Sequence, residues 1–151
     1  MTDLKKGIIE IDGYVVSSAS QASDFDDISP ETAKREVSKR GHTSVRFLNP
    51  SLANEVAMYV NVAFYTDSQI PEIELRPSIP PELKGRYEEV AKYKLSVAKR
   101  WLKGMIASEP HASNNSCVFY KFDDVDYFSS ISNDVHYGLV GGEISITYHG
   151  V

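Results

Sequence analysis

Residues 56–65 carry the clearest hydrophobic pattern in the chain. Apolar side chains occupy every second position: Val56, Met58, Val60, Val62 and Phe64. A period of two residues is the repeat of a β-strand, whose successive side chains point to opposite faces. The pattern therefore predicts a strand with one face packed against a buried core.

Seven further strands are predicted around this segment. Asp12-Gly13 lies between two apolar runs and predicts a hairpin over residues 7–17, because both turn positions require positive φ. The other strands are predicted at 43–48, 70–76, 117–122, 126–132 and 143–149. In the segment 70–76, Ile73 and Leu75 alternate with charged residues, so one face of that strand is expected to be wet.

Two helices are predicted. Ser29-Pro30-Glu31 combines an N-cap serine, a first-turn proline and an acid, and predicts a short helix that ends near Arg40-Gly41. Pro80-Pro81-Glu82 is expected to open one long helix, which continues to about Ala107 before Pro110. Its apolar stripe is interrupted by one lysine, Lys94, and consists of Leu83, Tyr87, Val90, Val97, Trp101 and Met105.

The order of these elements predicts an α+β protein. We expect an antiparallel sheet of about six to eight strands, packed on the long helix, with the short helix beside it. A length of 151 residues suits a single domain over 1–151. Gly141-Gly142, just before the last strand, is interpreted as a hairpin turn.

The net charge of −5 is distributed unevenly. Residues 84–103 hold seven Lys or Arg against two Glu, whereas residues 104–151 hold six acids and one base, Lys121. This balance repels nucleic acid as a whole and attracts a basic partner, although acidic surfaces also serve solubility. The basic side of the long helix is interpreted as a solvated face, partly because late lysines complement the helix dipole.

The sequence predicts a cytoplasmic protein without a membrane segment. It contains no eighteen-residue apolar run, and Glu10 and Asp12 interrupt the apolar start that a signal peptide would need. The single cysteine, Cys117, cannot form an internal disulfide. Its acidic surroundings oppose a reactive thiolate, so we expect it to pack as a small hydrophobic side chain.

No catalytic residue, metal site or cofactor is predicted. The four histidines show no metal-ligand spacing with each other. Asp134, His136 and His149 would meet only if the last two strands were suitably placed, and solvated histidines are the favoured interpretation. The paired carboxylates Asp26-Asp27 and Asp123-Asp124 are adjacent, which is unsuited to an acid/base pair on a strand.

Residues 120–128 form an acidic and aromatic segment that is the main candidate for binding. Aromatic side chains supply contact area, and carboxylates steer and pair with basic partners. Burial in the core is nevertheless the favoured interpretation for the aromatics. For the acids, a place in an ordinary turn and a role in binding are equally supported. The candidate partner-binding residues are Asp123, Asp124, Asp126, Asp134, Tyr137 and Glu143, with Asp24, Asp26 and Asp27 as a second patch.

The C-terminal third shows a Tyr-x-Phe strand, a tight turn, a second strand, a glycine-bearing loop and a final Ile-x-Ile-x-Tyr strand. The residues that carry this pattern are Tyr120, Phe122, Asp134, Gly142, Ile144, Ile146 and Tyr148. The pattern resembles the ending of small proteobacterial immunity proteins, which protect against contact-dependent growth inhibition and related secreted toxins. Those relatives often carry Trp-Gly in the turn after the Tyr-x-Phe strand, where this chain has Asp124-Val125.

The resemblance and the acidic surface together predict a non-enzymatic immunity protein that binds and neutralises a basic toxin domain. The expected partner is therefore a protein rather than nucleic acid or a membrane. The alternative is a small-molecule-binding or enzymatic α+β domain with a pocket between sheet and helix. The sequence does not specify an oligomeric state.

Overall fold

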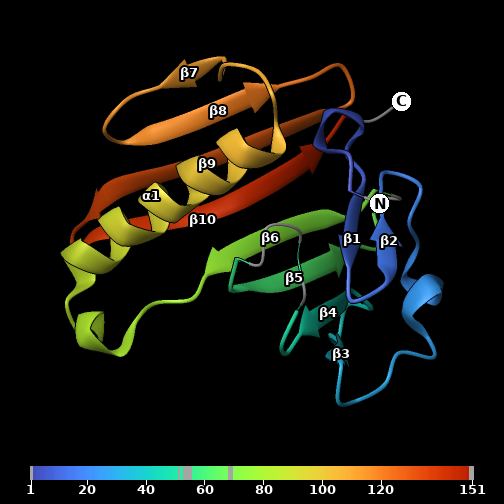
Figure 1. The fold of residues 1–151 in the computed structure, drawn as a ribbon. Helices are drawn as coiled ribbons and strands as arrows, with labels where there is room; N and C mark the ends of the chain where they lie inside the picture. Colours follow the sequence, from blue (N-terminus) through green and yellow to red (C-terminus); the bar gives the residue numbers. More distant parts are fainter. Residues whose placement is uncertain (1, 51, 53–55, 68–69, 150–151) are drawn as a thin grey trace.

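A computed structural model of the chain describes residues 2–50, 52, 56–67 and 70–149. Within them, eight strands form one antiparallel sheet in the order β3-β4-β5-β6-β10-β9-β8-β7 (Figure 1). The strands are β3 (Ala33–Val37), β4 (Thr43–Phe47), β5 (Met58–Phe64), β6 (Glu72–Pro77), β7 (Ala112–Ser113), β8 (Cys117–Lys121), β9 (Val125–Asp134) and β10 (Gly138–Tyr148). With the long helix α1 (Tyr87–Met105), this arrangement confirms the predicted α+β class.

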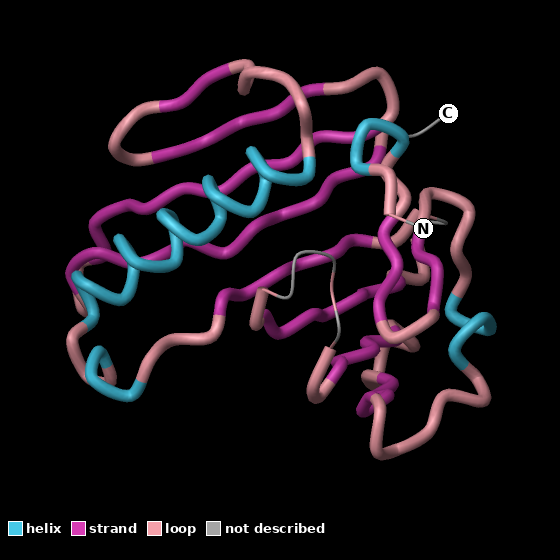
Figure 2. Tube along the Cα trace, viewed as in Figure 1, coloured by secondary structure: helices cyan, strands magenta, loops and turns pink. Residues whose placement is uncertain are grey.

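A second, two-stranded sheet is the predicted hairpin. Strands β1 (Ile9–Ile11) and β2 (Tyr14–Val16) are joined by Asp12 and Gly13, whose φ angles are 51° and 86°. The 3₁₀ helix η1 (Leu4–Lys6) precedes this hairpin, and η2 (Ala22–Phe25) follows it. Figure 2 shows the hairpin and α1 lying over the same side of the large sheet.

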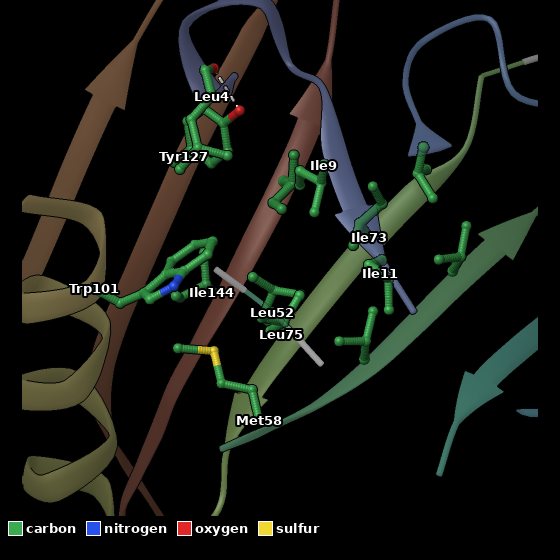
Figure 3. Packing of buried hydrophobic residues seen from close by; sticks show 14 of the residues in the cluster. Leu4, Ile9, Ile11, Leu52, Met58, Ile73, Leu75, Trp101, Tyr127 and Ile144 are labelled. Atoms are coloured by element: carbon green, nitrogen blue, oxygen red, sulfur yellow. Dashed lines mark hydrogen bonds between the residues drawn. The ribbon is translucent and has the colours of Figure 1, made fainter. Parts of the chain in front are cut away.

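The core lies between the large sheet and these two covering elements. Trp101 of α1, Ile9 and Ile11 of the hairpin, and Leu75 and Ile144 of the sheet are all buried there (Figure 3). The alternating residues of β5 that were predicted to face inward are buried as well. Burial of each large apolar side chain contributes about 1.5–3 kcal/mol, so this layer supplies the main driving force for folding.

The other side of the large sheet is its open face. None of the described helices and neither strand of the β1–β2 hairpin lies over it (Figure 1). Its residues alternate with the core residues, for example Glu72, Glu74 and Arg76 along β6. An antiparallel sheet tolerates such a wet face, because its strands can be apolar on one side only.

The predicted short helix after Ser29 is wrong. The Ser29 hydroxyl accepts a hydrogen bond from the Glu31 amide, and the Ser29 carbonyl accepts one from Thr32, so the cap signal organises a single turn. The chain then forms edge strand β3, which pairs with β4. Only Ala33 of β3 is buried, and a helix there would have lacked an apolar stripe to pack on the core.

The long helix begins later than predicted. Pro80-Pro81-Glu82 leads into a separate 3₁₀ turn, η4 (Pro81–Leu83), and Gly85 at φ 83° separates this turn from α1. The predicted stripe is right at Val97 and Trp101, whereas Tyr87 is 62% exposed. The face that packs on the sheet consists of Ala91, Leu95, Val97, Ala98, Trp101 and Leu102.

The double glycine also differs from its predicted role. Gly141 and Gly142 lie inside β10 at a β-bulge, and the hairpin turn falls earlier, at residues 135–137. A Cβ on Gly142 would lie 2.5 Å from Lys94 Cβ and 3.0 Å from the Ala91 carbonyl oxygen. Glycine is therefore what allows the helix to approach the sheet this closely.

The segment between α1 and β8, where no strand was predicted, contains the short edge strand β7, which pairs with β8. Among the described helices, none combines the length and the apolar character needed to cross a bilayer.

Candidate functional surface on the open face

The strand register brings acids from distant parts of the sequence onto the open face. Asp126 of β9 pairs with Thr147 of β10, and Thr147 pairs with Glu72 of β6. Directly paired residues share one side of a sheet, and neighbouring strands lie about 4.8 Å apart. Asp126 and Glu72 are therefore about 10 Å apart on the same face.

The next row of the register adds an acid and an aromatic pair. Phe128 of β9 pairs with Ser145, which pairs with Glu74 of β6. The Phe128 side chain is 41% exposed and meets Phe119 edge-on, with ring centroids 6.0 Å apart. His111 packs edge-on against Phe119 in turn, at 5.7 Å. An apolar contact area thus lies directly beside the acids.

We call these acids, with the two at the adjacent β8–β9 turn, the acidic strip: Glu72, Glu74, Asp123, Asp124 and Asp126. Three basic side chains lie near it. Arg76 bonds Glu74 at 3.1 Å, Lys121 is paired with Asp126 in the register, and the His149 ring lies 3.0 Å from Asp126. The negative charge of Glu72 is the main cause of a raised pKa for Tyr65, with smaller contributions from burial and Glu74. The strip therefore has a net negative potential.

The C-terminal strand holds the β8–β9 turn in place. The His149 amide donates to the Asp124 carbonyl at 2.9 Å, and the His149 ring nitrogens lie 3.0 Å from Asp126 Oδ2 and 3.0 Å from the Asp123 carbonyl. The hydrogen bond with Asp126, followed by that with Asp123, raises the pKa of His149. This geometry favours the imidazolium form, which can donate from both ring nitrogens.

Most aromatics of the segment 120–128 belong to the core, as the sequence analysis predicted. Tyr120 and Tyr127 are buried, Phe122 is partly buried, and Phe128 alone among the four is exposed. The Tyr127 hydroxyl donates to the Leu4 carbonyl at 2.5 Å. Burial strongly raises the pKa of Tyr127, so the phenol remains a hydrogen-bond donor.

The structure does not bring all predicted binding residues together. Asp134 and Tyr137 lie at the far end of the β9–β10 hairpin, and Asp134 is about 26 Å along β9 from Asp126 at 3.3 Å per residue. The Asp134 carboxylate accepts hydrogen bonds from the His136 and Tyr137 amides, and so organises that turn. The loose grouping of Asp134 and His136 with His149 is therefore absent.

Glu143 occupies a third place, against the helix. Its Oε1 lies 2.6 Å from Lys94 Nζ and 3.9 Å from Arg76 Nε. Burial alone would raise the pKa of Glu143, but the hydrogen bond from Lys94 and the neighbouring cations lower it overall. Glu143 is thus an ionised partner of Lys94, and Lys94 is not part of the solvated side of the helix.

The second predicted patch surrounds η2, away from the strip. Asp24 accepts a hydrogen bond from the Gln21 amide at 2.8 Å, and Asp26 forms an ion pair with Arg35 at 2.9 Å. Asp27 is exposed beside them. The predicted acidic residues therefore occupy four separate places, and of the first predicted group only Asp123, Asp124 and Asp126 lie together.

Sequence reasoning missed Glu72 and Glu74 as candidate binding residues. Their alternation with Ile73 and Leu75 correctly predicted that they lie on the wet face of the strand. Their proximity to Asp126 depends on β10 inserting between β6 and β9, a pairing that no local pattern specifies.

The surface also carries hollows. One of about 610 Å³ lies on the open face beside β4, β5 and β6 and is lined by Arg46, Leu48, Tyr59, Asn61, Glu74 and Arg76, among others. Others flank α1. Within the described chain, no three His, Cys, Asp or Glu side chains are grouped as metal ligands would be.

Comparisons of this chain with protein-family models, with curated protein sequences and with solved structures find no match.

Proposed function

We propose that this chain is a non-enzymatic immunity protein that binds and neutralises a basic bacterial toxin domain in the cytoplasm. The observation that carries the proposal is the register Asp126–Thr147–Glu72, which gathers acids of β9 and β6 on the open face. Exposed Phe128 lies in the adjacent row.

The composition of this surface suits such a partner. A nuclease toxin must be basic to hold phosphate, and a carboxylate surface of opposite potential accelerates its diffusional encounter. Aromatic side chains supply the desolvated contact that a strip of acids lacks, since exposed charges by themselves add little affinity. Phe128, Phe119 and the acidic strip combine both properties.

The test starts with capture of the partner. The tagged full chain, used as bait in lysate of its native bacterium at moderate salt, is expected to retain a basic protein identifiable by mass spectrometry. That protein, produced alone in a bacterial host, is expected to stop growth, and co-production of this chain is expected to restore growth. A captured protein that is harmless when produced alone would contradict the immunity function.

Purified partner then tests the surface. The Glu72→Gln/Asp124→Asn variant is expected to associate about five- to tenfold more slowly at low salt, with a weaker salt dependence. The matched control Glu82→Gln/Glu88→Gln removes the same charge from exposed positions at the start of the helix region. Equal association rates for the two variants would show that the acidic strip does not attract the partner.

One hollow favours the alternative, a small-molecule site between helix and sheet. A groove of about 550 Å³ between α1 and the β7–β8 region is lined by Ile106, Val118 and Tyr120 among others. A thermal-shift screen of metals and metabolites tests it, because a ligand that binds the native state stabilises it by an amount that grows with the logarithm of its excess over its dissociation constant. A hit whose effect is abolished by Val118→Trp would support this alternative.

A further inference from the structure

The outer side of α1 carries a row of cations that the proposed function does not use. We call it the basic ridge: Lys92, Lys99, Arg100 and Lys103. Lys92, Lys99 and Lys103 are separated by seven and four residues, so they lie on one side of the helix. The ridge is about 16 Å long at 1.5 Å per residue. It points away from the buried face that contains Ala91, among others.

The chain neutralises this ridge only in part. Lys92 pairs with Glu88 at 3.5 Å, and the Lys99 ammonium donates to the Asn114 carbonyl. Over the described residues, Arg100 and Lys103 have no carboxylate within ion-pair distance. Arg100 and Lys103, both exposed and both in the C-terminal half of the ridge, are therefore available to an external anion.

A groove with an apolar floor runs beside the ridge. It encloses about 400 Å³, and all four ridge cations line it together with Ser96 and Asn115. Leu95 and Ile131 form its apolar part, Leu95 from α1 and Ile131 from β9. Cations above an apolar floor are complementary to a ligand that presents carboxylates on one side and aliphatic groups on the other.

We propose that this groove is a second docking site, which binds an acidic amphipathic segment of another protein. Its charge complementarity excludes the basic toxin domain as occupant and requires a different partner. The groove is formed mainly by α1, and α1 covers the side of the sheet opposite the open face (Figure 1), so the two proposed sites lie on opposite sides of the sheet.

An acidic peptide fits this groove better than a nucleic acid does. Residues 84–103 hold the basic excess, and the rest of the chain carries a net charge of −10, given −5 overall and +5 in that segment. This field repels a long polyanion more strongly than a short peptide. The groove floor is aliphatic, without the aromatic platform on which single-stranded bases stack.

The test measures fluorescence anisotropy of the full chain with labelled probes. A peptide of about twelve residues with Glu and Leu on opposite sides of a helix matches the length of the ridge. A Glu/Ser peptide of equal charge removes the apolar contact, and a single-stranded oligonucleotide of equal charge represents nucleic acid. The Glu/Leu peptide is expected to bind at low salt about tenfold more tightly than the Glu/Ser peptide.

Two variants locate the binding. Arg100→Ala/Lys103→Ala is expected to weaken the Glu/Leu peptide about tenfold, whereas the matched control Lys5→Ala/Lys6→Ala is expected to leave its affinity unchanged. Circular dichroism verifies that both variants fold. Absence of Glu/Leu binding, equal binding of the Glu/Ser peptide, equal loss in both variants, or tighter binding of the oligonucleotide would each overturn the proposal. None of these results depends on the toxin-binding function.

Discussion

Lys94 Nζ lies 2.6 Å from Glu143 Oε1, and this ion pair joins the long helix to the bulge of the last strand. The Lys94 side chain is 12% exposed and that of Glu143 is 28% exposed. The pair is therefore sheltered from water and from the salt screening that weakens surface pairs. It lies beside Gly142, where a Cβ atom would come within 3.0 Å of α1.

Removal of one partner of this pair is expected to destabilise the protein. Lys94→Met leaves the partly buried Glu143 carboxylate with only the more distant Arg76 as a cation, at 3.9 Å, and should lower the free energy of unfolding by about 2–3 kcal/mol. Lys94→Met/Glu143→Leu should recover part of that loss, since no charge remains to be solvated. Urea denaturation of the single and double variants measures the coupling, and additive losses would show that the pair contributes nothing.

Gly142→Ala is expected to loosen the packing of α1 on β10. The new Cβ meets Lys94 Cβ at 2.5 Å and backbone atoms of α1 at 3.0 Å, in addition to the strain of φ 94°. We expect a loss of about 2–4 kcal/mol in thermal or urea unfolding. The control is Gly138→Ala, where φ is 75° but no atom lies within 4 Å of the new Cβ, so about 1–2 kcal/mol of strain alone is expected. Equal losses would exclude the close approach as the cause.

The contacts of His149 predict a pH dependence of stability. Its pKa is raised above 6.5 in the folded state by Asp126 and Asp123, so folding favours the protonated ring. The resulting stabilisation is fully present below pH 6.5 and is lost as the pH rises through the higher folded-state pKa. The melting temperature of wild type should fall over that interval more than that of His149→Ala. His136→Ala, at the far end of the hairpin, should retain the wild-type slope; a flat wild-type profile would contradict the prediction.

Two buried phenols are expected to hold the N-terminal segment on the sheet. Tyr127 donates to the Leu4 carbonyl and Tyr148 donates to the Gly7 carbonyl at 2.7 Å. Tyr148→Phe removes the hydrogen bond to the buried Gly7 carbonyl, and Tyr127→Phe leaves the Leu4 carbonyl with the Gly7 amide as its remaining donor. Each substitution should cost about 1–2 kcal/mol, with the larger loss for Tyr148→Phe. Hydrogen exchange should show faster exchange at residues 3–8 in both variants. Unchanged protection there would indicate that apolar packing, not these hydrogen bonds, fixes the segment.

The binding surface could be predicted from the sequence only in part. The exposure of Asp123 and Asp124 followed from their place in a turn, and the wet side of β6 followed from its alternation. Asp134, Glu143 and the η2 acids were equally acidic in sequence, but the structure uses them for a turn, an ion pair with Lys94, and local contacts. Net charge along a sequence does not distinguish these uses, because each depends on which cation or amide lies nearby.

The sequence by itself determined the features that depend on neighbouring residues. Asp12-Gly13 specified a hairpin through its backbone preferences, and the period of two in residues 56–65 specified which side chains of β5 face the core. Only tertiary structure decided that residues 33–37 form a strand despite the cap at Ser29, because pairing with β4 outweighs a helix that has no apolar face. It also decided that Glu72 and Asp126 share a surface, since sheet order depends on contacts between segments far apart in the chain.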